Sequence, residues 1–93
     1  MIYNIVVEPE AFHDLLSIKK YITRQDTSKK ANQFISELKK IIKTLNEMPE
    51  RCRKSHYLDI QNTHDLIYKK YTIVFQIRKN KVHILSIFRQ KSY

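Results

Sequence analysis

The stretch DLIYKKYTIVFQIRKNKVHILSIFR, residues 65–89, decides the fold of this chain. It holds three strand-length runs rich in β-branched and aromatic residues, separated only by the pairs Lys69-Lys70 and Lys79-Asn80. Two-residue connections of this kind join antiparallel neighbours in tight hairpins. The stretch therefore predicts an antiparallel meander of three strands.

Side-chain alternation predicts how the meander lies in the molecule. In the middle run one face is fully apolar and the other is more polar; the first consists of Tyr71, Ile73, Phe75 and Ile77, the second of Thr72, Val74, Gln76 and Arg78. The last run is apolar on both faces, with Val82, Ile84 and Phe88 on one side and Leu85 and Ile87 on the other. We therefore expect the last strand to lie inside the sheet rather than at its edge.

Two amphipathic helices are predicted upstream of the meander. The first begins near Pro9, and its expected apolar stripe comprises Phe12, Leu15, Leu16 and Ile22, with Ala11 and Ile18 at its margins. The second carries Ala31, Phe34, Ile35, Leu38, Ile41, Ile42 and Leu45 at helical spacing; Met48 extends the series and Pro49 ends it. A short polar link joins the two helices, so they form a hairpin with one shared apolar side.

An opening run, IYNIVV at residues 2–7, reads as a further strand. The expected fold is therefore one α+β domain over residues 1–93, in the order β-α-α-β-β-β, with an antiparallel meander sheet and a helical hairpin packed on one face. The other face is expected to be open and basic at its rim. A polar connection at residues 50–63 links helix and sheet, with a short extended piece expected at 57–60.

Composition excludes several classes of function. With 0 glycines, the chain has neither a phosphate-binding P-loop nor a dinucleotide-binding fingerprint. Its single cysteine, Cys52, cannot form an internal disulfide, and no apolar run approaches membrane-spanning length, so a cytoplasmic location is expected. The four histidines and Cys52 show no zinc-ligand spacing, and we expect neither a metal nor a cofactor.

Charge indicates the kind of partner. The chain has 18 Lys+Arg against 9 Asp+Glu, a net charge of +9, and no acidic residue follows Asp65. Such one-sided charge favours polyanions or acidic proteins as partners. The residues that we expect to bind a target lie in the long connection and at strand ends: Arg51, Arg53, Lys54, His56, Arg78, Arg89 and Lys91.

A metal-free ribonuclease is one chemistry that these residue types allow. Cleavage needs a base for the 2′-hydroxyl, a cation for the phosphorane and an acid for the leaving oxygen, and His, Lys, Arg and Tyr can fill these roles. If the chain is such an enzyme, the catalytic candidates are Arg89, Lys91 and Tyr93.

The order of elements resembles the RelE/ParE superfamily of bacterial toxins from type II toxin–antitoxin pairs. The family's first helix, with alanine followed by aspartate-leucine, is similar to EPEAFHDLLSIKKYI; its second, closing on proline, is similar to ANQFISELKKIIKTLNEMP. Its paired strands, the first opened by tyrosine, resemble DLIYKKYTIVFQI and KVHILSIF. The resemblance implies a compact toxin that is silenced by an antitoxin lying across its surface.

Two targets occur within this superfamily. RelE-like members cleave mRNA in the ribosomal A site, whereas ParE-like members poison DNA gyrase. Ile67 stands where the nucleases carry an arginine, and Ser92 stands where YoeB-like nucleases carry a histidine before their terminal tyrosine. The linked helices, YITRQDTSKKANQF, look more ParE-like. The resemblance thus implies gyrase inhibition first, ribosome-dependent mRNA cleavage second and a non-toxic basic interaction module third.

The charge and the resemblance together predict an acidic partner. We expect a short reading frame directly beside this gene that encodes an acidic protein with a DNA-binding segment, because an acidic, partly disordered chain gains on-rate and affinity from a +9 surface. The sequence of the flanking DNA checks this. A neighbourhood without such a frame would count against the whole module.

Overall fold

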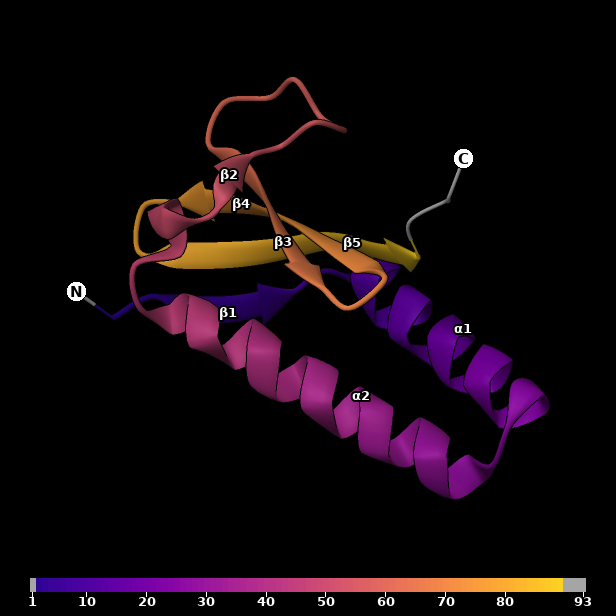
Figure 1. Ribbon diagram of the computed structural model, residues 1–93. Helices are drawn as coiled ribbons and strands as arrows, with labels where there is room; N and C mark the ends of the chain where they lie inside the picture. The colour runs from indigo at the N-terminus through magenta and orange to yellow at the C-terminus, as the bar shows by residue number, and fades with distance from the viewer. Residues whose placement is uncertain (1, 90–93) are drawn as a thin grey trace.

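The computed structural model describes residues 2–89 and shows a five-stranded sheet with two helices against it (Figure 1). Five strands lie in the order β1-β5-β4-β3-β2; their bounds are β1 Asn4–Val7, β2 Arg53–Lys54, β3 Thr63–Tyr68, β4 Tyr71–Arg78 and β5 Lys81–Arg89. Helices α1, Pro9–Gln25, and α2, Ser28–Lys43, form an antiparallel hairpin, and the short 3-10 turns η1, Thr44–Asn46, and η2, Pro49–Arg51, follow. The predicted α+β fold class is confirmed.

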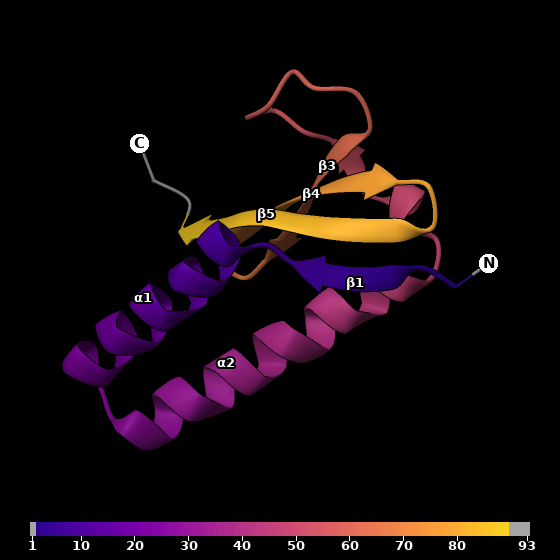
Figure 2. The same ribbon diagram turned by 180° about the vertical axis from the view of Figure 1, so that it is seen from behind.

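The sheet is mixed rather than wholly antiparallel. β1 pairs in parallel with β5, from Asn4 opposite Lys81 to Val7 opposite Ile84, whereas β3, β4 and β5 form the predicted meander. β5 therefore lies between β1 and β4, inside the sheet as expected (Figure 2). The extended piece predicted at 57–60 is wrong, because the additional strand β2 lies at Arg53–Lys54.

The core lies between the helical hairpin and strands β4 and β5. Its completely buried members include Leu38 of α2 and Leu45 of η1. From the sheet they include Ile73, Phe75 and Ile84. The predicted inward face of the middle strand is confirmed, because Tyr71, Ile73 and Phe75 belong to this core and Ile77 packs against it.

The predicted stripe of α1 is rotated relative to the observed one. Ala11, Leu15 and Ile18 are buried, whereas Phe12 and Leu16 are 54% and 46% exposed. Ala11 is completely buried and belongs to the core, so the inward face of α1 is centred nearer to Ala11, Leu15 and Ile18 than the sequence predicted. The larger Phe12 is consequently left on the outside.

The second helix ends earlier than predicted. Its α-helical part stops at Lys43 and a 3-10 turn carries the chain to Asn46. Met48, expected to extend the apolar stripe, has positive φ and is 70% exposed. Neither helix of the described part of the chain is both long and apolar enough to cross a membrane.

A β-bulge in β5 reverses the predicted facing of the strand's end. Ile84 pairs with Phe75 but Ser86 pairs with Val74, so Leu85 is an extra residue. Beyond a one-residue insertion every side chain changes face. Ile87 is therefore buried in the core instead of facing away from the helices, and Phe88 turns to the sheet's second face, the one opposite the helices.

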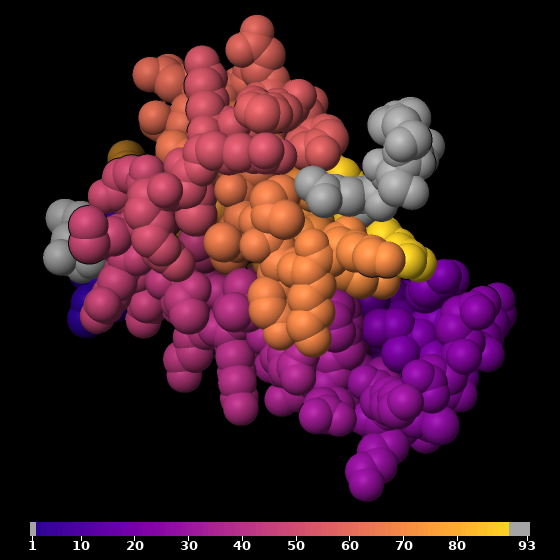
Figure 3. Space-filling model, viewed as in Figure 1, coloured from indigo at the N-terminus to yellow at the C-terminus, as the bar shows by residue number. Residues whose placement is uncertain are grey.

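The second face was predicted to be open, and this is wrong. Thr72 and Val74 on β4 are 0% and 1% exposed, and Asp65 on β3 is 2% exposed. The connection at residues 55–62 rises above the sheet on this side, as the space-filling view also shows (Figure 3). Tyr57 of this connection meets Phe88 edge to face, with ring centroids 4.8 Å apart.

The two-residue hairpins form as predicted, although no glycine is present. Lys69 and Lys79, the first residue of each turn, both have φ of 54°. Positive φ at the first central position alone is the pattern of a type II′ turn, where glycine is usual. Positive φ is uncommon for lysine because its Cβ crowds the backbone, so each turn lacks the ease that glycine would give it.

The bulge is held by a side chain from α1. The backbone N–H of Ile87, two residues beyond the inserted Leu85, donates to the Asp14 carboxylate at 2.8 Å. A partly buried donor to a charged acceptor contributes more than an ordinary hydrogen bond. Asp14 thus fixes α1 to the region of β5 where the strand register changes.

Replacing Asp14 tests this link. We expect Asp14→Ala to lower the free energy of unfolding by about 1–2 kcal/mol, because the Ile87 N–H loses its acceptor. Asp14→Asn, which keeps an acceptor oxygen, should lose less. Urea unfolding followed by circular dichroism measures both, with Glu10→Ala on the exposed first turn of α1 as control. Equal losses in Asp14→Ala and Glu10→Ala would contradict the assignment.

Candidate functional site

Arg89 lies on the helix side of the sheet, against α1. Its Nη1 donates to the hydroxyl of Tyr21 at 2.8 Å, and its guanidinium carbon lies 5.6 Å from the centre of the Tyr21 ring. Arg89 pairs across the sheet with Tyr71, whose side chain is in the core. The bulge at Leu85 therefore directs the predicted arginine away from the second face.

A small hollow lies beside this arginine. Its volume is about 350 Å³, and it is lined by Asp14, Ser17, Ile18, Tyr21, Tyr71, Ile87, Phe88 and Arg89. Burial raises the pKa of the Tyr71 hydroxyl, the charge of Arg89 opposes that rise and Tyr21 adds to it. Tyr71 is consequently neutral at physiological pH. The hollow offers one cation, one carboxylate and two phenols, and the guanidinium already donates to Tyr21.

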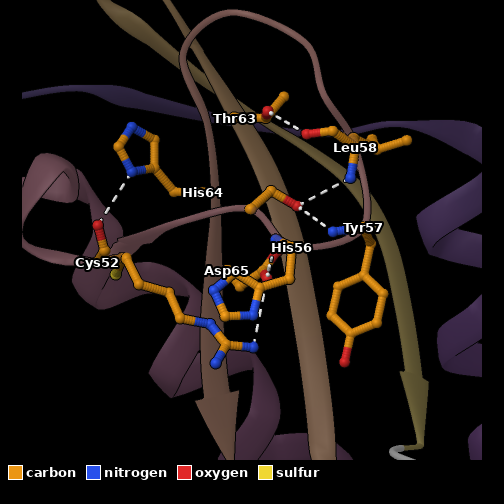
Figure 4. A network of polar contacts seen from close by, with 9 residues as sticks. Cys52, His56, Tyr57, Leu58, Thr63, His64 and Asp65 are labelled. Carbon is orange, nitrogen blue, oxygen red and sulfur yellow. Dashed lines mark hydrogen bonds and ion pairs between the residues drawn. The ribbon is translucent and has the colours of Figure 1, made fainter.

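A second group of predicted residues gathers where the 55–62 connection leaves β2. Asp65 of β3 lies under it with no exposed side-chain surface, and its Oδ2 accepts the His56 backbone N–H at 3.0 Å (Figure 4). Arg53 Nη2 lies 3.4 Å from the same oxygen. The other oxygen, Oδ1, is buried and has no hydrogen-bond partner among the described residues. Asp65 therefore anchors both Arg53 and the backbone at His56.

The same connection is shaped by short-range hydrogen bonds. The hydroxyl of Ser55 accepts the backbone N–H groups of Tyr57 and Leu58, both at 3.2 Å, and Thr63 donates to the carbonyl of Leu58 at 3.2 Å (Figure 4). Gln76 of β4 donates to the Gln61 carbonyl at 3.1 Å. These bonds hold the segment over the sheet.

Arg51 and Arg78 have structural partners. Arg51 donates to the carbonyls of Glu47 and Met48 and to the Thr44 hydroxyl, so it closes the end of η1. Arg78 Nε donates to the Gln76 amide oxygen at 2.6 Å. Lys54, opposite His64 on β3, is exposed.

The predicted site residues are thus not brought together by the fold. Arg53, His56 and Asp65 lie with the connection on the second face, whereas Arg89 reaches α1 on the helix face, with the sheet between them. The predictions for Lys91 and Tyr93 fall outside the described residues. The assignment of all these residues to a site therefore stays a prediction.

Sequence reasoning missed the residues that position the predicted ones. Tyr21 and Asp14 on α1 act on Arg89 and the bulge, and Asp65 acts on Arg53. Asp65 had one sequence signal, since it is the last acidic residue before a long basic stretch. Asp14 and Tyr21 lie in the stretches that carry the family resemblance, but nothing in the local sequence indicates that they contact Ile87 and Arg89.

Metal and thiol chemistry find little support in the described part of the chain. Within residues 2–89 no three side chains of His, Cys, Asp or Glu gather in a way that could hold a metal ion. Burial raises the pKa of the Cys52 thiol, and the nearby charge of Arg51 only partly opposes this. Cys52 is thus largely protonated at neutral pH, which suits a structural residue rather than a nucleophile.

A family model described as the ParE toxin of the type II toxin–antitoxin system parDE matches residues 5–92. The chain belongs to the ParE toxin family. It is therefore a toxin of a type II toxin–antitoxin system, and the superfamily resemblance seen in the sequence is confirmed. No curated protein sequence is similar enough to the chain to count as a match.

Solved toxin–antitoxin structures share the fold of this ParE-family chain. One comes from the chromosomal ParDE system of P. aeruginosa, with a TM-score of 0.84 and 15% identity over 97% of this chain and 98% of that one. Another comes from the RelBE2 toxin–antitoxin complex of Mycobacterium tuberculosis, with a TM-score of 0.72 and 15% identity over 97% of this chain and 100% of that one. At this identity the likeness establishes the fold alone.

Removing the Asp65 anchor should loosen the connection above the sheet. We expect Asp65→Ala to lower the free energy of unfolding by about 1–2 kcal/mol and to speed amide exchange at His56, because that N–H and Arg53 lose their acceptor. Hydrogen exchange and urea unfolding measure the two effects. The control is Asp59→Ala, an exposed carboxylate in the same connection. Unchanged exchange at His56 would contradict the anchoring role.

Proposed function

We propose that this toxin arrests growth by inhibiting DNA gyrase and is neutralised by a cognate acidic antitoxin. The observation that carries the proposal is the match of residues 5–92 to the ParE model, since ParE-like members of the superfamily act on gyrase. A cytoplasmic location and an antitoxin partner remain predictions. The structures to which the chain is similar come from a ParDE system and from a RelBE2 toxin–antitoxin complex, which supports such a partner.

The placement of the cations also favours a binding function over catalysis. A metal-free ribonuclease needs its base, acid and phosphate-stabilising cation around one scissile bond. Among the described candidates, His56 and Arg53 lie on one side of the sheet and Arg89 lies on the other. Arg51 and Arg53 are also engaged by acceptors of the chain itself.

Ribosome-dependent mRNA cleavage is the second candidate because of the hollow beside Arg89. Tyr21 and Tyr71 line it with that arginine, so a phosphate would meet a guanidinium and a phenol there, although the carboxylate of Asp14, which also lines the hollow, would oppose it. In that case Arg89 stabilises the phosphorane, and Lys91 or Tyr93 transfers protons. A protein that neither inhibits gyrase nor cleaves mRNA would match the third possibility, a non-toxic basic interaction module.

A paired assay separates these candidates. Purified protein is added to a gyrase supercoiling reaction and to translating ribosomes, whose mRNA ends are mapped. We expect loss of supercoiling or gyrase-dependent DNA breaks, with mRNA left intact. A-site cuts that fall about 10²–10³-fold in Arg89→Ala, as expected when a phosphate-stabilising group is removed, would refute gyrase inhibition. Tyr93→Phe is the second test variant, and Lys29→Ala on exposed α2 is the control.

A further inference from the structure

The outward face of α1 carries an open hollow that is lined only by residues of this helix. Its volume is about 670 Å³, and its polar lining consists of His13, Ser17, Lys19, Lys20, Thr23 and Arg24. All of these residues are exposed, because α1 turns Ala11, Leu15 and Ile18 toward the core. α1 lies at the margin of the molecule, with α2 beside it on one side (Figure 1). We call these six polar residues the basic face of α1.

Three members of the basic face carry a positive charge at neutral pH: Lys19, Lys20 and Arg24. None of them forms an ion pair with another residue between positions 2 and 89. Arg24 differs in this environment from Arg89, whose guanidinium donates to Tyr21. The three cations are therefore available to a molecule that approaches from outside.

The nearest carboxylates along the helix are engaged elsewhere. Asp14 accepts the backbone N–H of Ile87 at 2.8 Å on the side of α1 that meets the sheet. Asp26, just beyond the helix, pairs with Lys30 at 3.2 Å. No acidic residue lies between these two aspartates in the sequence. The positive charge of the basic face is consequently not compensated within α1.

The chemistry of the basic face suits phosphate groups better than a protein surface. Leu16, which is 46% exposed, is its only large apolar neighbour in the hollow. The centres of protein interfaces are enriched in aromatic residues and depleted of lysine. Phosphate oxygens, in contrast, are contacted by lysine, arginine, serine and threonine, and Ser17 and Thr23 stand among the cations. A phosphate backbone therefore matches this surface more closely than an acidic protein does.

A double strand matches it more closely than a single strand. Proteins bind single strands largely by stacking bases on aromatic side chains, and none of the described residues that line the hollow is a Phe, Tyr or Trp. The basic face is also rigid, because its side chains project from one helix and span about 16 Å from His13 to Arg24. Duplex DNA presents one negative charge per ~1.7 Å of its axis, so several phosphates lie within that span.

We propose that the basic face of α1 binds the phosphate backbone of duplex DNA without preference for base sequence. Binding follows from neutralisation of phosphates by Lys19, Lys20 and Arg24 and from release of the counterions that these phosphates hold. This activity goes beyond gyrase inhibition, because it needs DNA alone. In a complex with gyrase the same face would add a contact to the DNA that the enzyme holds.

The salt dependence of binding tests the proposal. Fluorescence anisotropy of a labelled duplex of arbitrary sequence is measured against the full chain at several salt concentrations. We expect Lys20→Ala combined with Arg24→Ala to make the slope of log K against log[salt] shallower by about 1.8, because each lost phosphate contact removes about 0.9. Affinity at low salt should fall about tenfold or more. A parent protein that does not bind the duplex at low salt would overturn the proposal.

A matched variant separates the basic face from the general charge of the protein. Lys29→Ala combined with Lys40→Ala removes the same charge from exposed positions of α2 that do not line the hollow. We expect this control to change the slope and the affinity much less. Equal changes in the two double variants would show that DNA senses only the net charge of +9, and the assignment to α1 would be wrong. Circular dichroism confirms that each variant folds.

Two competitors test the identity of the ligand. A second duplex of unrelated sequence should displace the labelled DNA as well as the first one does. Single-stranded RNA of the same length, and polyglutamate of the same total charge, should displace it less well. Stronger displacement by the RNA would assign the face to RNA, and equal displacement by polyglutamate would reduce it to a surface for any polyanion. Either result would overturn the inference.

The outcomes also separate this inference from the proposed function, because the binding assay contains no gyrase. DNA binding that depends on Lys20 and Arg24, in a protein that leaves supercoiling unaffected, would refute gyrase inhibition alone. Gyrase inhibition by a protein that does not bind DNA would refute the role of the basic face alone.

Discussion

One inserted residue in β5, Leu85, determines which face of the sheet each of the following side chains occupies. Ile84 and Ile87 both enter the core because Leu85 breaks the alternation between them. The core gains an isoleucine next to α1, and Asp14 gains the N–H that fixes the helix there. The same insertion turns Arg89 toward Tyr21 and Phe88 toward Tyr57. The arginine and the 55–62 connection are thereby kept on different sides of the sheet.

Most of the fold followed from sequence because the decisive contacts are local. The hairpins, the inward face of β4 and the interior position of β5 came from turn spacing and two-residue periodicity. The facing of α1 could not be read in this way, since Ala11 contributes little to an apolar stripe and yet is completely buried. The parallel pairing of β1 depends on residues 77 positions apart, as Asn4 and Lys81 are, and the local patterns do not contain it.

The contacts of the candidate site residues were not predicted, because they also join segments that lie apart in the sequence. Arg51, Arg53 and Arg89 were recognised as cations, but their partners Thr44, Asp65 and Tyr21 come from other elements of the fold. Each of these guanidiniums has a partner within the chain, whereas Lys39, Lys40 and Lys43 of α2 are exposed and form no ion pair among the described residues. The positive charge that remains available to another molecule is thus concentrated more in lysines than in the arginines.

The position of β5 has a consequence for how the protein becomes active during its synthesis. Of the five described strands this one leaves the ribosome last, yet it lies between β1 and β4 and supplies Val82, Ile84 and Ile87 to the core. Until it emerges, β1 has no neighbour in the sheet and the helical hairpin lacks part of the surface that it covers. A nascent chain cut short before Lys81 would therefore lack the interior strand of the sheet and three core side chains, and could not form this structure.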